Sequence, residues 1–172
     1  MANFYTDNRD LAFTLDNLDL GEAVALREND YQLAAEFETA PVDYNDALDN
    51  FRRVLSVVGD LCGNNIEPRS REVDAAGPHF ENGVVTYHPL TVDNLEDLRK
   101  ADVSGVMLPH RFGGLNFPVT IYTMMTEMVS RADASLQNLF GLQDIAETIA
   151  EFGSEEQKQE FLPRFARGEV DG

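Results

Sequence analysis

One run of apolar residues constrains the fold of this chain more than any other feature of its sequence. Between residues 44 and 66 apolar side chains recur every three or four positions, the spacing of one buried face of an α-helix. These positions are Ala47, Leu48, Phe51, Val54, Leu55, Val58, Leu61, Cys62 and Ile66. Asp43 can cap the first free N–H groups of this helix, and Pro68 is expected to end it.

Three more helices are predicted in the last third of the sequence. The first opens at Pro118, the second is capped by Asp133 or Ser135, and the third begins at Ser154, with Gln157 in the capping-box position. Apolar residues lie around much of the first two helices, which indicates packing on more than one side. The predicted fold class is therefore mainly α, a helical bundle.

Residues 1–40 are predicted to form an N-terminal arm with short helices, and residues 41–172 one helical domain. In the arm, Asp7 can cap a turn and Gly21 interrupts the helical pattern. Within the domain, Asn82-Gly83 suits a tight turn, which predicts a small hairpin or extended excursion near residues 80–90. A helix over Asn94–Ala101, capped by Thr91 or Asp93, should follow.

The charge of the chain restricts its partners. It has 31 acidic residues against 13 Lys and Arg, a formal net charge of -18. Such a chain repels nucleic-acid phosphates and anionic lipids, so neither nucleic acid nor a membrane surface is an expected partner. The N-terminus is acidic and does not resemble a signal or transit peptide, and Cys62 is the single cysteine, without a disulfide partner. These features predict a cytoplasmic location.

No catalytic or metal-binding motif emerges from the residues themselves. The sequence has no glycine-rich nucleotide loop and no GxSxG elbow. The three histidines, His79, His88 and His110, fall in predicted loops, and the two beside Pro89 and Pro109, His88 and His110, are interpreted as surface residues. None of them completes a Glu-x-x-His pair, so Glu127, Glu147 and Glu151 are interpreted as exposed or rim carboxylates. No metal site is predicted.

Four short motifs, in this order and spacing, resemble the acyl-CoA dehydrogenase family. They are Pro-x-x-x-Gly-Gly (Pro109, Gly113, Gly114), Arg-Ala-Asp-Ala-Ser (131–135), Phe-Gly-Ser-Glu-Glu-Gln-Lys (152–158) and Leu-Pro-x-x-x-x-Gly-Glu (162–169). The arm, with Tyr5, Arg9-Asp10 and Phe13, and the segment over residues 72–89 are similar to the subgroup with an N-terminal extension. Arg131 and Asp133 are expected to fix a corner between two helices by an ion pair and a cap.

The resemblance implies the N-terminal helical domain of a flavoprotein of fatty acid β-oxidation. In that family FAD takes a hydride from the β carbon of an acyl-CoA thioester, a glutamate base removes the α proton, and an electron-transfer flavoprotein accepts the electrons. Members are commonly homodimers or homotetramers. The flavin-contacting motifs and the base are expected in central β and C-terminal helical domains that this chain lacks. No catalytic residue, and no FAD-binding residue, is therefore assigned here, and the chain alone is expected to be inactive.

The resemblance also implies where the acyl group binds. The helix from Ser135 to Thr148 would form the wall and floor of the acyl pocket, with Gln137, Phe140, Gly141 and Asp144 as substrate-binding residues. A bulky ring at Phe140 would shorten the pocket and favour a short, branched or cyclic acyl group. The alternative is that Phe140 only packs the core between two helices.

Two other functions stay open at this point. The chain could be a stand-alone acidic helical binding or scaffold module without flavin, or an acidic helical domain of no assignable function. The last residues, Gly168 to Gly172, look like the start of a strand of a following domain, which favours the dehydrogenase. A flavin absorbance band in the whole protein would separate these hypotheses.

Overall fold

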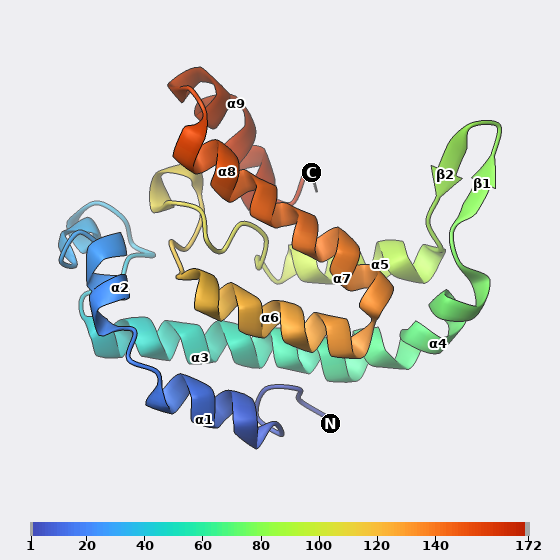
Figure 1. The fold of residues 1–172 in the computed structure, drawn as a ribbon, viewed down its shortest axis with the longest axis horizontal. Coiled ribbons are helices and arrows are strands. Elements are labelled where there is room, and N and C mark those ends of the chain that lie inside the picture. The colour runs from blue at the N-terminus through green and yellow to red at the C-terminus, as the bar shows by residue number, and fades with distance from the viewer. Residues whose placement is uncertain (1, 171–172) are drawn as a thin grey trace.

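The computed structural model describes residues 2–170 and is mainly helical (Figure 1). The longest element runs along one side of the molecule and comprises α3 (Tyr44–Leu61), the π-helical turn η2 (Cys62–Ile66) and α4 (Glu67–Ala76). Helix α6 (Val119–Ala132) packs on α3, and α7 (Ala134–Gly141) packs on α6. The main core lies between these helices, so the predicted fold class is confirmed.

The prediction that Pro68 ends the long helix is wrong. The chain continues through it into α4, because the preceding turn is π-helical and the N–H of Glu67 donates to the carbonyl oxygen of Cys62. In a regular helix the proline ring would clash with the carbonyl four residues earlier. The wider turn relieves that clash, and Pro68 lies at the start of α4, where a missing N–H is tolerated.

The N-terminal residues pack onto the long helix. Helices α1 (Arg9–Asn17) and α2 (Gly21–Arg27) bury Leu11, Leu15 and Val24 against the core. Before them, the N–H of Phe4 donates to the carbonyl oxygen of Gly59 at 2.9 Å. A Cβ atom on Gly59 would lie 2.6 Å from the backbone nitrogen of Tyr5, so only glycine allows this approach.

Two expectations for this region need correction. The first helix is capped by Asn8, whose Oδ1 accepts from the N–H groups of Asp10 and Leu11, and the predicted cap Asp7 lies outside it. Arg131 does not pair with Asp133: its guanidinium lies 4.1 Å from the centre of the Phe4 ring. The other half of that prediction is confirmed, because Asp133 caps α7 through the N–H groups of residues 135 and 136.

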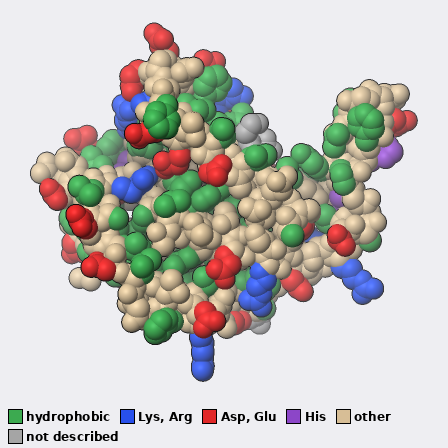
Figure 2. All heavy atoms as spheres, in the orientation of Figure 1, with side chains coloured by type: hydrophobic (Ala, Val, Ile, Leu, Met, Phe, Trp, Pro, Cys, Tyr) green, Lys and Arg blue, Asp and Glu red, His purple; other side chains and the backbone are tan. Residues whose placement is uncertain are grey.

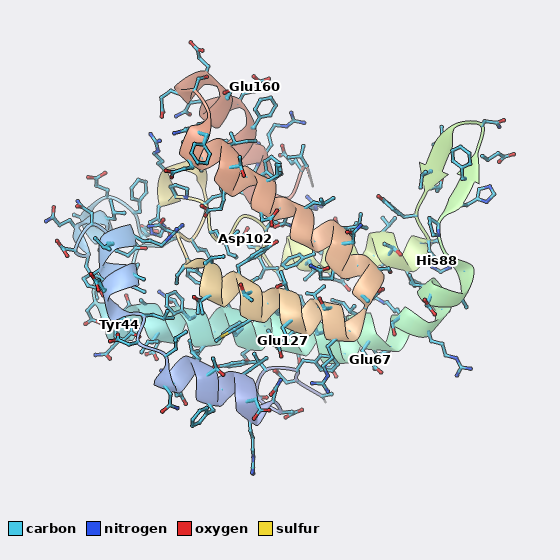
Figure 3. All side chains as sticks on the ribbon, in the orientation of Figure 1. Tyr44, Glu67, His88, Asp102, Glu127 and Glu160 are labelled. Carbon is cyan, nitrogen blue, oxygen red and sulfur yellow. The ribbon has the colours of Figure 1, made fainter. Side chains whose placement is uncertain are left out.

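The hairpin is confirmed and projects from one end of the molecule. Strands β1 (His79–Glu81) and β2 (Val84–Thr86) pair antiparallel across a turn in which Asn82 and Gly83 have φ angles of 52° and 82°. The following helix α5 (Pro89–Lys100) begins earlier than predicted. His88, at the base of the hairpin in Figure 3, is its cap, and its Nδ1 accepts from the N–H of Leu90 at 3.3 Å.

The C-terminal helices form a second, smaller core. The helix expected from Ser135 to Thr148 is divided into α7, the 3-10 turn η4 (Leu142–Asp144) and α8 (Ile145–Phe152). Helix α9 (Glu155–Ala166) has the predicted capping box of Ser154 and Gln157. It packs on α8 and on the short turn η3 (His110–Phe112). The remaining short turn, η1 (Gln32–Ala35), follows α2, and none of the described helices is long and apolar enough to cross a membrane.

Candidate functional site

A cleft of about 430 Å³ lies between α6 and the α7–η4 segment, and it is named here the α6–α7 cleft. Three of the four residues predicted to bind substrate, Gln137, Gly141 and Asp144, line this one cleft. The other lining residues are Met107, Val119, Tyr122, Thr123, Thr126, Asn138 and Leu142. The structure thus brings together residues of two helices and of the loop before α6.

Gly141 leaves room for the side chain of Gln137. A Cβ atom at position 141 would lie 2.8 Å from the Gln137 Nε2 atom. The two residues are one helical turn apart on α7, so the amide lies along the helix where a larger residue at position 141 would displace it. This arrangement keeps the amide at the cleft wall.

Tyr122 is the aromatic residue among the described residues that line the cleft, and it is buried. Its hydroxyl lies 3.2 Å from the carbonyl oxygens of both Phe140 and Gly141, to which it donates. Burial raises the pKa of this phenol above its ordinary value, and the nearby Asp144 carboxylate adds to the effect. The hydroxyl therefore stays protonated and ties α6 to the end of α7.

Phe140 lies outside the α6–α7 cleft. Only 1% of it is exposed, and its ring stacks on that of Tyr122 with the centroids 5.8 Å apart. It lines a different cleft of about 240 Å³ between α5, α7 and residues 168–170. The packing of Phe140 in the core is thus observed, and any influence of its ring on the α6–α7 cleft acts through Tyr122.

The loop that carries Met107 is anchored by the N-terminal residues. Arg27 donates from Nη2 to the carbonyl oxygen of Met107 at 2.5 Å and from Nε to that of Asn116 at 2.9 Å. The same guanidinium lies 3.3 Å from the carboxylate of Glu147 on α8. One side chain of α2 therefore holds both the loop at the cleft and the helix behind it.

Next to this contact, Glu28 and His110 form a buried pair. The interpretation of His110 as a surface residue is wrong, because its side chain is 1% exposed and Nε2 lies 3.1 Å from a Glu28 oxygen. Asn116 donates to the same carboxylate at 3.0 Å, and the Thr39 hydroxyl lies 2.9 Å from the His110 Nδ1 atom. The partners are far apart in the sequence, so no local pattern could have revealed the pair.

A third cleft, of about 380 Å³, lies where the hairpin meets α4, α5 and α7. Pro78 and Tyr87 from the hairpin line it, together with Leu139 and Asn138, and Asn138 also lines the α6–α7 cleft. Farther out, Phe80 and Val85 face one another across the strands and are 69% and 57% exposed. Figure 2 shows hydrophobic side chains gathered on this projection.

The acidic residues do not assemble into a metal site. Among residues 2–170, no three His, Cys, Asp or Glu side chains come close enough to hold an ion. Glu127 points outward from α6 (Figure 3) and Glu151 is exposed, while Glu147 is half-buried beside Arg27. For these carboxylates the interpretation as exposed or rim residues agrees with the structure.

Comparison with known proteins identifies relatives for most of the chain. Residues 49–169 match the family model "Acyl-CoA dehydrogenase, N-terminal domain". The chain is 29% identical over 133 residues to 3-methylmercaptopropionyl-CoA dehydrogenase of Ruegeria pomeroyi, covering 73% of this chain and 21% of that protein. It is 24% identical over 126 residues to mitochondrial isovaleryl-CoA dehydrogenase of Solanum tuberosum, covering 72% of this chain and 28% of that protein. The matched segment thus spans less than a third of either relative.

Proposed function

Because this chain belongs to the acyl-CoA dehydrogenase family and forms its N-terminal domain, we propose that the α6–α7 cleft is part of the acyl-binding pocket of a dehydrogenase that acts on acyl-CoA thioesters. The observation that carries the proposal is that Gln137, Gly141 and Asp144 line one cleft. Both named relatives act on short acyl groups, methylmercaptopropionyl and isovaleryl, which supports a short or branched acyl group here.

In this proposal the chain binds and orients the acyl group. Met107 and Tyr122 form an apolar part of the cleft wall, and the hydrogen-bonded hydroxyl of Tyr122 keeps the end of α7 in place. Phe140 acts as a substrate-binding residue indirectly: its ring stacks on the Tyr122 ring, which fixes the position of Tyr122 and so limits the depth of the acyl pocket. A pocket of set depth discriminates between acyl groups that differ by a methylene or two.

The 240 Å³ cleft does not fit the flavin dinucleotide. Its diphosphate needs N–H donors or cations, such as a free helix N-terminus or an Arg side chain. The 240 Å³ cleft has one guanidinium, that of Arg99, which already binds Glu96 at 2.7 Å, and Glu169 also lines it. We therefore assign no residue of this chain to FAD, and the proposal places FAD in other parts of the whole protein.

The remaining parts of the proposal concern the whole protein. We propose an FAD-dependent enzyme of fatty acid β-oxidation, homodimeric or homotetrameric, that passes electrons to an electron-transfer flavoprotein in the cytoplasm. The chain alone is proposed to be inactive, because no described residue has been assigned as base or flavin ligand.

The test is a titration of the whole protein that contains this chain with short acyl-CoA thioesters. We expect a visible flavin band that bleaches on addition of substrate. Gly141→Leu, whose side chain would displace the Gln137 amide and fill the cleft, should raise KM more than it lowers kcat. Thr148→Leu places the same leucine side chain on the exposed side of α8 and should leave both unchanged.

The same experiment distinguishes the proposed dehydrogenase from the alternative, a stand-alone binding module. A colourless protein that neither bleaches nor binds acyl-CoA would contradict the proposal and favour a stand-alone acidic binding module. Equal kinetic effects of Gly141→Leu and Thr148→Leu would show that the α6–α7 cleft is not the acyl pocket.

A further inference from the structure

The α6–α7 cleft has at least as many polar side chains in its wall as apolar ones. The polar ones belong to Thr123, Thr126, Gln137, Asn138 and Asp144. A bound alkyl tail would remove water from these groups without replacing its hydrogen bonds, and each group left unpaired costs free energy. The wall therefore disfavours a ligand that is only hydrocarbon.

Several of these polar groups can only accept hydrogen bonds. Thr123 donates its hydroxyl hydrogen to the carbonyl oxygen of Val119, and Thr126 donates to that of Thr123, both at 2.9 Å. Each hydroxyl then offers lone pairs to the cleft, and the ionised carboxylate of Asp144 has no hydrogen to donate. A ligand that complements Thr123, Thr126 and Asp144 must bring a donor, while the amides of Gln137 and Asn138 can donate or accept.

Asp144 gives the cleft a negative charge. The described lining includes no Lys, Arg or His, so no cation in the wall balances the carboxylate. Its charge reaches the buried side of the cleft, because Asp144 is one cause of the raised pKa of Tyr122. A second carboxylate bound beside Asp144 would be repelled.

We infer that the cleft binds acyl groups whose distal end carries an uncharged hydrogen-bond donor, such as a carboxamide or a hydroxyl, and rejects acyl groups that end in a carboxylate. The distal N–H or O–H donates to Asp144 or to the hydroxyl oxygens of Thr123 and Thr126. The inference rests on the proposed function, because it names the class of acyl thioester that the same cleft selects.

The test measures Kd by isothermal titration calorimetry with the whole protein and three matched CoA thioesters. Glutaramoyl-CoA, glutaryl-CoA and 5-methylhexanoyl-CoA have acyl groups of the same heavy-atom shape that end in a carboxamide, a carboxylate and an isopropyl group. We expect glutaramoyl-CoA to bind tightest, with Kd about tenfold lower than that of 5-methylhexanoyl-CoA. Glutaryl-CoA should bind more weakly than either.

Two variants assign the effect to one side chain. Asp144→Asn should remove most of the difference between glutaryl-CoA and glutaramoyl-CoA, because the repulsion is gone while the size is kept. Glu151→Gln removes one negative charge from an exposed position outside the cleft and should leave the order of Kd values unchanged. Both substitutions are at exposed positions, and circular dichroism verifies that the variants fold.

The outcomes distinguish this inference from the proposed function. Equal Kd values for the three thioesters, or tightest binding of glutaryl-CoA, would overturn the inference and leave an acyl pocket in place. Unchanged discrimination in Asp144→Asn would also overturn it. Failure of the protein to bind any acyl-CoA would instead overturn the proposed function.

Discussion

Glu28 and His110 lie 82 residues apart in the chain and meet in the interior, where the His110 Nε2 atom is 3.1 Å from a Glu28 carboxylate oxygen. Their side chains are 4% and 1% exposed. Together they join the N-terminal residues to the loop that carries Met107 into the α6–α7 cleft.

Removing one partner of this pair should destabilise the protein. Glu28→Ala leaves the buried His110 ring and the Asn116 amide without their acceptor, and each buried polar group left unpaired costs about 1 to 3 kcal/mol. Urea unfolding followed by circular dichroism measures the change in the free energy of unfolding. Glu38→Ala, an exposed carboxylate in the same segment, is the control and should change it by less than about 0.5 kcal/mol. Equal effects would contradict a role for the pair.

A single methyl group added at Gly59 should detach the N-terminal residues from α3. In Gly59→Ala the new Cβ atom would meet the backbone nitrogen of Tyr5 at 2.6 Å, so the segment before α1 must move away from α3. We expect faster proteolysis near Phe4 and Tyr5 and a loss of stability of about 1 to 3 kcal/mol. Gly21→Ala, at the half-buried start of α2, adds a Cβ atom that would meet only the Asp19 side chain, at 3.3 Å, and should not increase proteolysis there. An unchanged cleavage rate in Gly59→Ala would argue against this packing.

Tyr122 should make the stability of the fold depend on alkaline pH. Its folded-state pKa is raised by burial and then by Asp144, so the folded state holds the proton more tightly than the unfolded chain. The contribution of this difference is complete below the unfolded pKa of about 10 and is lost as the pH rises above it. Between about pH 10 and pH 11 the wild-type protein should therefore lose stability more steeply than Tyr122→Phe. Parallel curves in urea unfolding would contradict the shift.

Tyr122→Phe also loses the hydrogen bonds to the backbone of α7. Below about pH 9 the variant should be less stable than the wild type by about 1 kcal/mol, since the carbonyl oxygens of Phe140 and Gly141 lose a donor. The two curves should converge as the pH rises, which the same unfolding series measures.

Cys62 should not react with thiol reagents while the protein is folded. It is fully buried on the long helix, and burial raises the pKa of its thiol to about 12. At about pH 8 the folded protein should therefore react with a disulfide reagent only at the rate of its unfolding. The guanidinium-unfolded chain is the control and should react at once. Rapid labelling of the folded protein would show that this part of the core opens readily.

The periodic parts of the sequence predicted the fold well. The helical face from Ala47 to Ile66 forms the core, and Asp43, Asp133 and Ser154 cap the helices that follow them. Caps and helical faces depend on neighbours within a few residues, so a local pattern suffices to find them.

The wrong predictions concern residues whose local sequence is compatible with more than one structure. Pro68 can end a helix or follow a π turn, and the sequence does not distinguish these cases. Pro89 likewise marked the first residue of α5, although the apolar pattern begins later. His110 required knowledge of Glu28, which only the tertiary fold brings near.

The candidate site was predicted in part. Gln137, Gly141 and Asp144 share one wall because their spacing places them on one side of α7 and η4. Phe140 turns toward the core, and the division of the predicted helix at residues 142–144 was not visible in the sequence. Arg27 and Met107 were missed, since their hydrogen bond joins segments that are distant in the chain.

The hydrogen bond from Arg27 to Met107 has a thermodynamic consequence. The N-terminal residues and the cleft share the loop that this bond holds, so a ligand that shifts the position of Met107 would also change how firmly the N-terminal residues are docked. Coupling between two such events is reciprocal. Consider a ligand that binds more tightly when the N-terminal residues are docked. Removal of the N-terminal residues weakens the binding of this ligand by some factor, and the bound ligand must protect the N-terminal residues from proteases by the same factor. Ligand affinity at the cleft can thus be measured from the proteolysis of the N-terminal residues, without any probe in the cleft itself.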